Sequence, residues 1–340
     1  MTVTGVRALV PRGTDEPRDW RTAMAHIAVL VETDSGLTGL GVGGGGRAGV
    51  HVVDTVLREV LVGRDPADIE GLWGQMYRAT LPFGRKGLAV MALSGVDLAL
   101  WDLAGKVAGR PVYELLGGLR HPVIPAYASI GWEVTDEAER GFRHVKLHMP
   151  RPSPGMAANV AVVRRARERL GPDVRLYTDA FLAWDVEETL RLAGAFVPHG
   201  VAWIEEPLSP DDLDGYAELV RRSPIPIAGG EHEYGVHGFR EVLDRRAHTI
   251  LQPDACWYGG LTPLRKIFAL AAEHGAWVVP HRGAEVWGLH AIAALGDRPL
   301  AESGRPWVTW LCGAPAIEGG VVRPTDAPGF GVELDPAACP

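Results

Sequence analysis

The sequence predicts an α/β protein, with a TIM-like (β/α)7β barrel preceded by a separate α+β domain. Three observations support this fold class. The chain has 340 residues, enough for a barrel of about 200–250 residues and one smaller domain. Strand patterns precede helical patterns in residues 1–120, whereas short strands alternate with helical segments from residue 121 onward. Acidic residues recur directly after these short strands at an even interval, as expected at a barrel mouth.

The first 50 residues alternate between apolar and polar positions, as β-strands do. In the run HIAVLVETDSGLTGLGVGG, two apolar stretches flank a DSG turn, which predicts an antiparallel hairpin. The polar segment PRGTDEPRDWR (11–21) precedes the hairpin, and the segment GGGGR (43–47), expected to be flexible, follows it. Each of these two loops is either a plain connection or a lid.

Residues 51–116 are expected to be helical. The four-residue spacing of Val52, Val56 and Val60 is typical of a buried helix face. A longer apolar segment, LAVMALSGVDLALWDLA (88–104), contains two aspartates, which favours a buried helix over a membrane span. Strands followed by helices, without alternation, predict an α+β domain over residues 1–120.

Strand-like and helical segments alternate over residues 121–317, which are expected to form the barrel. Asp185, followed by Glu188, predicts a helix N-cap after the third strand. Residues 318–340 are rich in Gly and Pro and are expected to form a tail that packs back on the N-terminal domain. The eight expected strands are VIPAYAS, HVKLH, RLYT, VAWI, IPIAG, TILQ, WVVP and WVTWL.

The composition narrows the class of protein. The net charge is −8 and no stripe of Lys and Arg is present, which disfavours a nucleic-acid partner. The three cysteines are too few and too scattered for a disulfide framework, which fits a reducing cytoplasm. The N-terminal segment lacks the basic and apolar pattern of a signal peptide. We therefore expect a cytoplasmic protein that binds neither nucleic acid nor a membrane.

Three carboxylates follow consecutive strands at one interval. Asp179 follows RLYT, Glu205 follows VAWI and Glu231 follows PIAGG, so that 205 − 179 and 231 − 205 are both 26. A single acid at a strand end is often a helix cap or a salt-bridge partner, but the repeated interval favours one shared site. All-oxygen ligation suits a hard cation, so we predict Mg²⁺ on these three side chains.

The next two strands carry a predicted acid–base pair. Asp254 follows ILQP, and His281 follows WVVP 27 residues later (281 − 254). A carboxylate that accepts from one imidazole nitrogen fixes the tautomer and raises the basicity of the other nitrogen. We predict His281 as the general base and Asp254 as its partner.

Lys146 and His148 lie two residues apart on the second strand and therefore share a face. A lysine inside a barrel needs an anion, and the metal-binding carboxylates would supply one. Removal of a proton next to a carboxylate builds up negative charge, which a metal ion and an ammonium group both stabilise. The predicted chemistry is proton abstraction α to a carboxylate, with the enediolate stabilised by Mg²⁺ and Lys146.

These residues stand in segments that resemble the mandelate racemase branch of the enolase superfamily. The segments are ETDSGLTGLG, GVDLALWDLAGK, WIEEP, QPD…GG and PH, which together span nearly the whole chain. Within that branch the chain most resembles the L-rhamnonate dehydratase-like acid-sugar dehydratases, through TDAFLAWDVEETLRLA, WIEEPLSPDDLDGY, GGEHEYGVHGFR, LQPDACWYGGLT and VVPHRGAEVWGLH. The resemblance implies an enolase-like fold, in which the N-terminal domain caps the barrel mouth, and a homo-oligomer.

The resemblance also implies roles for single residues. Mg²⁺ would bind Asp179, Glu205 and Glu231. The Asp254–His281 dyad would act as the base, and in such dehydratases a single histidine takes the α-proton and then protonates the departing β-hydroxyl.

Other positions bear on the substrate. His232 falls where such enzymes place another active-site histidine, and Lys146 falls on the basic residue of the second strand. Many relatives carry a second lysine where this chain has His148, which is therefore either a second acid/base or a substrate contact. The last strand of the family offers an acid to the substrate carboxylate, and WVTWL places Thr309 there. Arg282, directly after the base, is also assigned to the substrate.

Dehydration of an aldonic-type sugar acid to its 2-keto-3-deoxy product is the predicted reaction, and L-rhamnonate is a candidate substrate. Racemisation or epimerisation of a 2-hydroxy acid, with His281 and His148 on opposite faces, is an alternative at the same site. A non-catalytic metal- or ligand-binding relative is a third interpretation, motivated by the missing acid on the last strand. A phosphate-binding aldolase is disfavoured, because no Gly-rich phosphate loop follows the last two strands.

Overall fold

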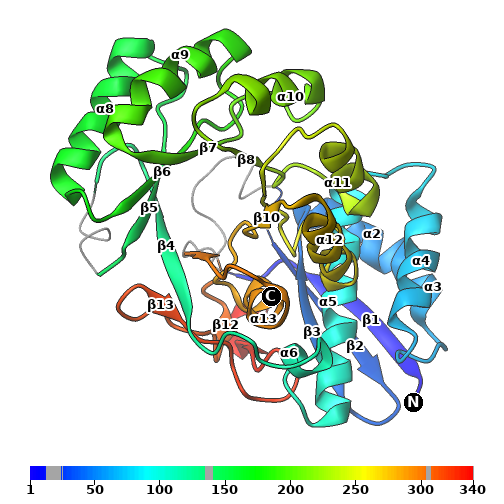
Figure 1. Cartoon of the computed structure of the whole chain (residues 1–340). Helices are drawn as coiled ribbons and strands as arrows, with labels where there is room; N and C mark the ends of the chain where they lie inside the picture. Colours follow the sequence, from blue (N-terminus) through cyan, green and yellow to red (C-terminus); the bar gives the residue numbers. More distant parts are fainter. Residues whose placement is uncertain (13–23, 25, 135–140, 304–307, 340) are drawn as a thin grey trace.

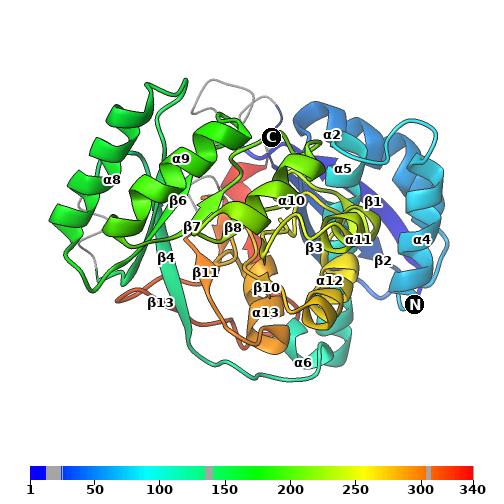
Figure 2. The ribbon, with the colours of Figure 1, turned by 45° about the horizontal axis from the view of Figure 1, so that its top comes forward.

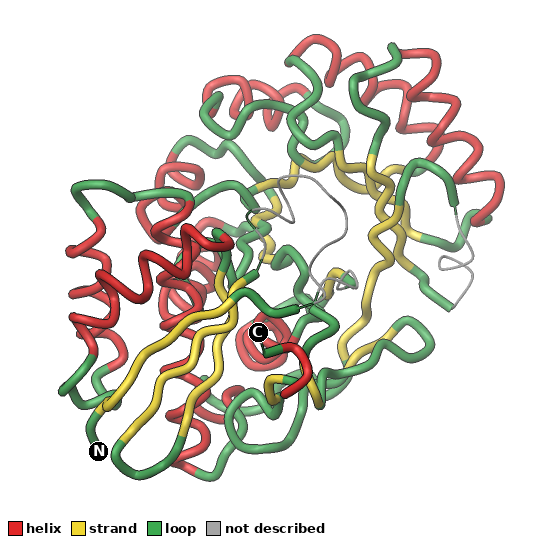
Figure 3. Tube along the Cα trace, turned by 180° about the vertical axis from the view of Figure 1, so that it is seen from behind, coloured by secondary structure: helices red, strands yellow, loops and turns green. Residues whose placement is uncertain are grey.

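The computed structural model describes residues 1–12, 24, 26–134, 141–303 and 308–339. These residues form an N-terminal antiparallel sheet with its own helices and a curled, parallel-rich sheet with helices on its outer side (Figure 1). Figure 3 shows the two sheets as separate layers, seen from behind. Most of the segment PRGTDEPRDWR, from residue 13 onward, lies outside the described residues.

The N-terminal sheet contains the predicted hairpin and one preceding strand. Its antiparallel order is β1-β2-β3, with β1 Val3–Leu9, β2 Ile27–Thr33 and β3 Thr38–Gly43. The turn between β2 and β3 closes where Gly36 donates its N–H to the Thr33 carbonyl, at 3.1 Å. Gly36 has φ 82°, which glycine adopts without strain. The hairpin prediction is confirmed.

The expected helical region is also present. Its elements are α2 (Gly46–Val52), η1 (Val53–Leu57), α3 (Arg58–Leu61), α4 (Ile69–Thr80), α5 (Leu88–Ala108) and α6 (Val112–Leu115). The GGGGR segment was expected to be flexible, but its last two residues already belong to α2. Gly45 and Gly46 take φ values of 96° and 52°, which turn the chain from β3 into the helix.

Helix α5 lies directly on β3. A Cβ atom at Gly41 would lie 2.0 Å from the Gly95 carbonyl oxygen, and one at Gly39 would lie 2.0 Å from the Ala99 carbonyl oxygen. The alternating glycines of β3 therefore permit a contact that no larger residue allows. By length and composition α5 could cross a membrane, but 89% of its apolar window is buried inside the protein. The prediction of a buried helix is confirmed.

The second sheet has parallel strands in the order β10-β9-β8-β7-β6-β5-β4-β11. A helix follows each strand from β5 to β10, and these helices cover the outside of the curve (Figures 1 and 2). The strands are β4 Ile124–Ile130, β5 His144–His148, β6 Arg175–Asp179, β7 Val201–Glu205, β8 Ile227–Gly229, β9 Ile250–Leu251, β10 Trp277–Val278 and β11 Ala301–Glu302. The helical elements are α8 Met156–Leu170, α9 Val186–Phe196, η2 Val197–His199, α10 Leu213–Arg222, α11 Gly235–Asp244, α12 Leu261–His274 and α13 Val286–Leu295. Between the two ends of this strand order, Ala284 donates its N–H to the Glu302 carbonyl at 2.8 Å.

Local sequence signals explain parts of this sheet. Asp185 caps α9 as predicted, because its Oδ1 accepts from the Glu188 N–H at 2.7 Å. Tyr177 precedes Asp179 by two residues on β6, so the two side chains share the inner face. The Tyr177 ring stacks on the Trp203 ring with centroids 3.5 Å apart. A buried aromatic layer thus fills the space beneath the acidic end of the strands.

The prediction that WVTWL forms the eighth strand of the barrel is wrong. Thr309 is exposed and lies in a turn, and Leu311–Cys312 (β12) pairs antiparallel with Glu333–Leu334 (β14). The strand beside β4 is instead β11, which is only two residues long. So short a strand carries no alternating pattern, whereas the apolar run of WVTWL imitates one.

The C-terminal residues contact both parts of the molecule. Strand β13 (Val321–Val322) pairs antiparallel with β4. The Phe330 N–H donates to Asp102 Oδ1 on α5 at 2.8 Å, and the Arg12 N–H donates to the Ala338 carbonyl at 2.9 Å. The described residues end just after η3 (Pro336–Ala338). These contacts attach the tail to the N-terminal domain as well as to the sheet.

Candidate active site

Adjacent strand ends bring His148, Asp179 and Glu205 into one row. His148 pairs in register with Asp179 across β5 and β6, and Asp179 pairs with Glu205 across β6 and β7. Glu231 stands two residues beyond the end of β8, which is the next strand. The residues selected from the sequence therefore line the carboxyl end of the curled sheet, where barrel proteins carry their chemistry.

Lys146 is the buried cation of this row. Its Nζ lies 2.9 Å from Glu302 Oε1 and 3.7 Å from Asp179 Oδ2, and it also donates to Glu205 Oε1. Burial alone would lower the pKa of Lys146, but the charges of Glu205 and Glu302 outweigh burial and hold the pKa well above its usual value. Lys146 is therefore an ammonium group among carboxylates.

The three predicted metal ligands have too little positive charge around them. Asp179, Glu205 and Glu231 are 2%, 1% and 6% exposed. Burial raises the pKa of Glu205 to about 8, against the opposing charge of Lys146, and burial also raises the pKa of Glu231. A divalent cation would supply the missing positive charge, so these buried oxygen donors fit a hard cation such as Mg²⁺.

A second grouping overlaps the first. Glu206, Glu231 and His232 hold possible ligand atoms within 4.8 Å of one another. However, His232 Nδ1 lies 2.6 Å from Glu206 Oε2. Burial lowers the pKa of His232, but the Glu206 carboxylate outweighs this effect and raises the pKa to about 9. A protonated imidazole does not ligate a metal, so we interpret this group as an ion pair beside Glu231. Sequence reasoning missed Glu206, although it follows Glu205 in WIEEP.

The predicted acid–base pair is in contact. His281 Nδ1 lies 2.8 Å from Asp254 Oδ2, and His281 Nε2 lies 3.3 Å from Glu231 Oε2. One ring nitrogen is thus held by Asp254, while the other faces the predicted metal site. Burial lowers the pKa of His281, but Glu231, Glu302 and Asp254 outweigh burial and raise the pKa to about 9, so the ring is protonated while these acids carry no cation. A divalent cation at Glu231 would oppose the charge of that carboxylate and favour the neutral ring that a base requires. The contacts of the two ring nitrogens are those of an oriented general base.

Arg282 was predicted to contact the substrate, but its guanidinium has partners inside the protein. The side chain is 2% exposed and lies 2.9 Å from Asp254 Oδ2 through Nη2 and 3.6 Å from Glu285 Oε1 through Nη1. Nη1 also contacts Nε2 of His26, a residue of the N-terminal domain. The structure therefore associates Arg282 with the dyad instead of an open substrate surface.

The acid of the last strand is Glu302, and the assignment of this position to Thr309 is wrong. Glu302 is 1% exposed at the end of β11, where its Oε1 meets Lys146 and its Oε2 accepts from the Arg282 N–H at 2.8 Å. A sequence signal was available, because Glu302 follows the short run PLA in the same way that the other acids follow their strands.

Both ring nitrogens of His148 have partners. Nδ1 lies 2.9 Å from Asp179 Oδ2, and Nε2 lies 3.0 Å from the Ser129 hydroxyl. The second-strand pair thus faces the site from one side, as the two-residue spacing predicted, since Lys146 and His148 both contact Asp179.

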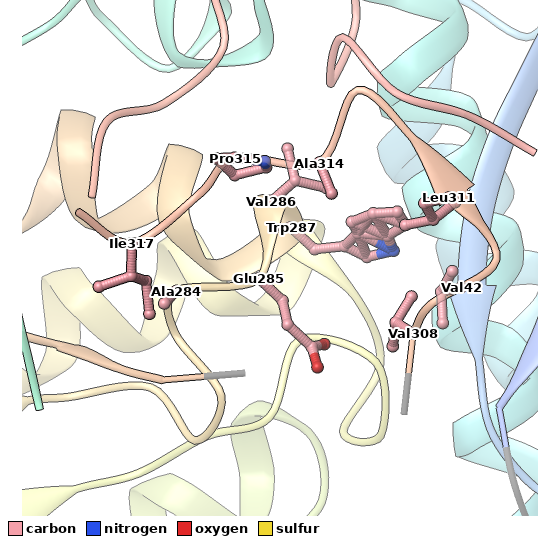
Figure 4. A pocket seen from close by; sticks show the side chains of 10 residues that line it. All are labelled: Val42, Ala284, Glu285, Val286, Trp287, Val308, Leu311, Ala314, Pro315 and Ile317. Atoms are coloured by element: carbon pink, nitrogen blue, oxygen red, sulfur yellow. The ribbon is translucent and has the colours of Figure 1, made fainter. Parts of the chain in front are cut away.

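A cavity of about 260 Å³ lies where β3, the start of α13 and the C-terminal segment meet (Figure 4). Among the described residues that line it, all are apolar except Glu285, whose carboxylate faces the space. Burial raises the pKa of Glu285 to about 7. None of the acids at the strand ends lines this cavity, so it lies beside the site described above and is separate from the row of carboxylates.

The curled parallel sheet carries buried acids at its carboxyl ends, with Lys146 among them and the His281–Asp254 pair beside them. These features define the class: an α/β protein whose site fits a metal ion and an acid–base residue. Comparison with known proteins narrows this class. Residues 133–338 match the family model "Enolase C-terminal domain-like", and residues 19–117 match "Mandelate racemase / muconate lactonizing enzyme, N-terminal domain". The chain therefore belongs to the mandelate racemase/muconate lactonizing enzyme family of the enolase superfamily.

Individual relatives agree with this membership. An L-rhamnonate dehydratase of Saccharopolyspora erythraea is 41% identical over 92% of this chain and 84% of that protein. The structure of rhamnonate dehydratase from Gibberella zeae complexed with Mg has a TM-score of 0.91 and 31% identity, covering 99% of this chain and 95% of that one. A racemase from Streptomyces coelicolor A3(2) with bound magnesium has a TM-score of 0.88 and 34% identity, covering 98% and 97%. One fold thus carries both of the reactions considered from the sequence.

Proposed function

We propose that the protein is a Mg²⁺-dependent hydro-lyase that dehydrates a sugar acid of the aldonate class to its 2-keto-3-deoxy acid, with an L-rhamnonate-like acid as substrate. The observation that carries this proposal is the contact of His281 with Asp254 at 2.8 Å, with the other ring nitrogen facing Glu231. The relatives named as rhamnonate dehydratases, one of them complexed with Mg, support both the reaction class and the metal.

The residues divide the chemistry between them. Asp179, Glu205 and Glu231 would hold Mg²⁺, which when bound supplies positive charge next to the substrate carboxylate. His281 Nε2 takes the proton from the carbon α to that carboxylate, while Asp254 stabilises the imidazolium that forms. Lys146 stabilises the negative charge that builds up on the carboxylate. His281 then returns the proton to the β-hydroxyl, which leaves as water, and the resulting enol tautomerises to the keto acid.

The surroundings of His148 favour dehydration over epimerisation. A second base must present a ring nitrogen to the opposite face of the α-carbon, yet the nitrogens of His148 lie 2.9 Å from Asp179 and 3.0 Å from Ser129. His281 Nε2 is less closely engaged, since it lies 3.3 Å from Glu231. The third interpretation, a non-catalytic relative, was motivated by a missing acid on the last strand. Glu302 fills that position, which removes the motive.

Turnover in deuterated water distinguishes these reactions. The protein is incubated with Mg²⁺ and a panel of acid sugars that includes L-rhamnonate. Formation of a keto acid that reacts with semicarbazide supports dehydration. Deuterium at C2 of both epimers without keto acid would instead establish epimerisation, and no reaction with any acid would refute both.

The proposal also covers the domain boundaries, the cellular compartment and the oligomeric state. We infer a closed (β/α)7β barrel over residues 121–317, a capping domain over residues 1–120 and a tail over 318–340, supported by the Ala284–Glu302 hydrogen bond and by the tail contacts. The three free cysteines support a reducing compartment such as the cytoplasm. A homo-oligomeric state is proposed from family membership, and sedimentation of the purified protein tests it.

A further inference from the structure

The carboxylate of Asp254 is held by more than its histidine. Arg282 Nε lies 3.0 Å and Nη2 lies 2.9 Å from Oδ2, the same oxygen that accepts from His281 Nδ1. The other oxygen, Oδ1, accepts from the Cys256 N–H at 2.7 Å. Because both oxygens are fixed, the orientation of Asp254 depends on Arg282 as well as on the backbone.

Arg282 also reaches out of the curled sheet. Its Nη1 donates to Nε2 of His26, which directly precedes β2 of the N-terminal domain. His26 is 5% exposed. Burial, and then the charge of Arg282, keep the pKa of His26 well below its usual value, so the ring is neutral and can accept this bond. The N-terminal domain thus supplies a neutral acceptor to the cation that holds Asp254.

Trp257 adds a second connection between the two domains. The Arg282 guanidinium lies over the Trp257 ring at 5.4 Å from its centroid, and the same ring lies 5.6 Å from the His281 ring. Gly44, which follows β3 in the N-terminal domain, packs on the Trp257 ring, because a Cβ atom at Gly44 would lie 3.2 Å from Trp257 Cδ1. The N-terminal domain therefore touches both Arg282 and the ring on which Arg282 rests.

We propose that Arg282 is a positioning residue that ties the Asp254–His281 dyad to the N-terminal domain through His26. The dyad is correctly oriented only while His26 is in place, so docking of the N-terminal domain aligns the base as well as covering the site. The backbone of Arg282 supports a demanding role, since its φ of 50° is rare for a residue with a side chain. This inference rests on the proposed function of His281 as the base. It adds His26, a residue of the N-terminal domain, to the groups that orient that base.

A double-mutant cycle tests the coupling. His26→Leu removes the acceptor and is expected to lower kcat about tenfold, with KM changed by less than about twofold. His26→Gln, which retains an acceptor oxygen, is expected to recover part of the loss. In an Asp254→Asn background, His26→Leu is expected to have no further effect, because its influence passes through Asp254. The control Arg222→Met removes an exposed arginine that also pairs with carboxylates, on α10, and leaves kcat unchanged.

A readout that needs no turnover is the exchange of the His281 Nδ1 proton with water, followed by NMR. Faster exchange in His26→Leu and in Arg282→Lys, but not in Arg222→Met, supports the inference. Wild-type exchange and kcat in His26→Leu would overturn it, and so would a full additive loss of kcat in the Asp254→Asn background. If wild-type protein turns over none of the acid sugars, the proposed function fails, while proton exchange still decides the role of Arg282 and His26.

Discussion

Lys146 Nζ lies 2.9 Å from Glu302 Oε1, which joins the second strand of the curled sheet to its last strand through one buried ion pair. This contact assigns to Glu302 the position that sequence reasoning gave to Thr309. It also places Glu302 where it can orient Lys146 and stabilise the Arg282 backbone.

Replacement of Glu302 by glutamine is the first test. Glu302→Gln removes a charge that pairs with Lys146, and we expect kcat/KM to fall about 10²-fold, as for the loss of one preorganised electrostatic partner. Thr309→Val is the matched control, since Thr309 is exposed, and it should retain wild-type kinetics. Equal effects of the two substitutions would contradict the assignment.

A second test concerns the Asp254–His281 pair. Asp254→Asn leaves the shape of the site nearly unchanged but removes the charge that stabilises the imidazolium, so kcat should fall by about 10⁴. His281→Asn should abolish both keto-acid formation and exchange of the C2 proton. His274→Asn, at the end of α12, serves as the control. Persistent C2 exchange in His281→Asn would show that another group is the base.

Removal of the metal should stop the reaction and lower stability. We expect a chelator to abolish turnover and Mg²⁺ to restore it. Mg²⁺ at about 100 times its dissociation constant should stabilise the fold by about 2.7 kcal/mol, measured by thermal unfolding. Glu231→Gln should weaken this stabilisation, whereas Glu70→Gln, a surface acid paired with Arg265 and Lys266, should not. Identical shifts in both variants would exclude Glu231 as a ligand.

Asp97, which lies outside the candidate active site, is expected to make the stability of the fold depend on pH. It is fully buried on α5, where its Oδ2 accepts from the Thr262 N–H at 2.9 Å, and burial raises its pKa from 3.8 to about 7. Between these two values the folded protein binds one more proton than the unfolded chain, so the contribution of Asp97 to stability is lost as pH rises from about 4 to 7. The expected slope is about 1.4 kcal/mol per pH unit.

Comparison of wild type with Asp97→Asn isolates this effect. Thermal unfolding between pH 5 and 8 should show that wild type loses more stability than the variant as pH rises. Parallel curves for the two proteins would mean that Asp97 does not titrate in this window.

Two glycine substitutions, one at the contact between α5 and β3 and one on α9, are expected to have opposite effects on stability. Gly41→Ala should destabilise the fold by about 1–3 kcal/mol or more, because the new Cβ would lie 2.0 Å from the Gly95 carbonyl oxygen. Gly194→Ala, within α9, meets no atom within 4 Å and should stabilise by about 0.5–1 kcal/mol. Chemical denaturation measures both, and a stable Gly41→Ala protein would contradict the close approach.

Local patterns determined much of this protein. The β2–β3 hairpin, buried α5 and the Asp185 cap follow from turn residues, apolar periodicity and capping, which act over a few residues. The row of acids followed from their interval, because side chains that end successive parallel strands meet at one edge.

Only the tertiary structure decided which side chains complete that row. Strand β11 is two residues long and is held by pairing with β4. The short run PLA before Glu302 is a weaker strand signal than the apolar run of WVTWL, so Glu302 was overlooked. Likewise, His26 and Arg282 are 256 residues apart in the chain, and no local pattern predicts their contact. Such contacts arise from the packing of one domain on another, which depends on the whole fold and not on any single segment.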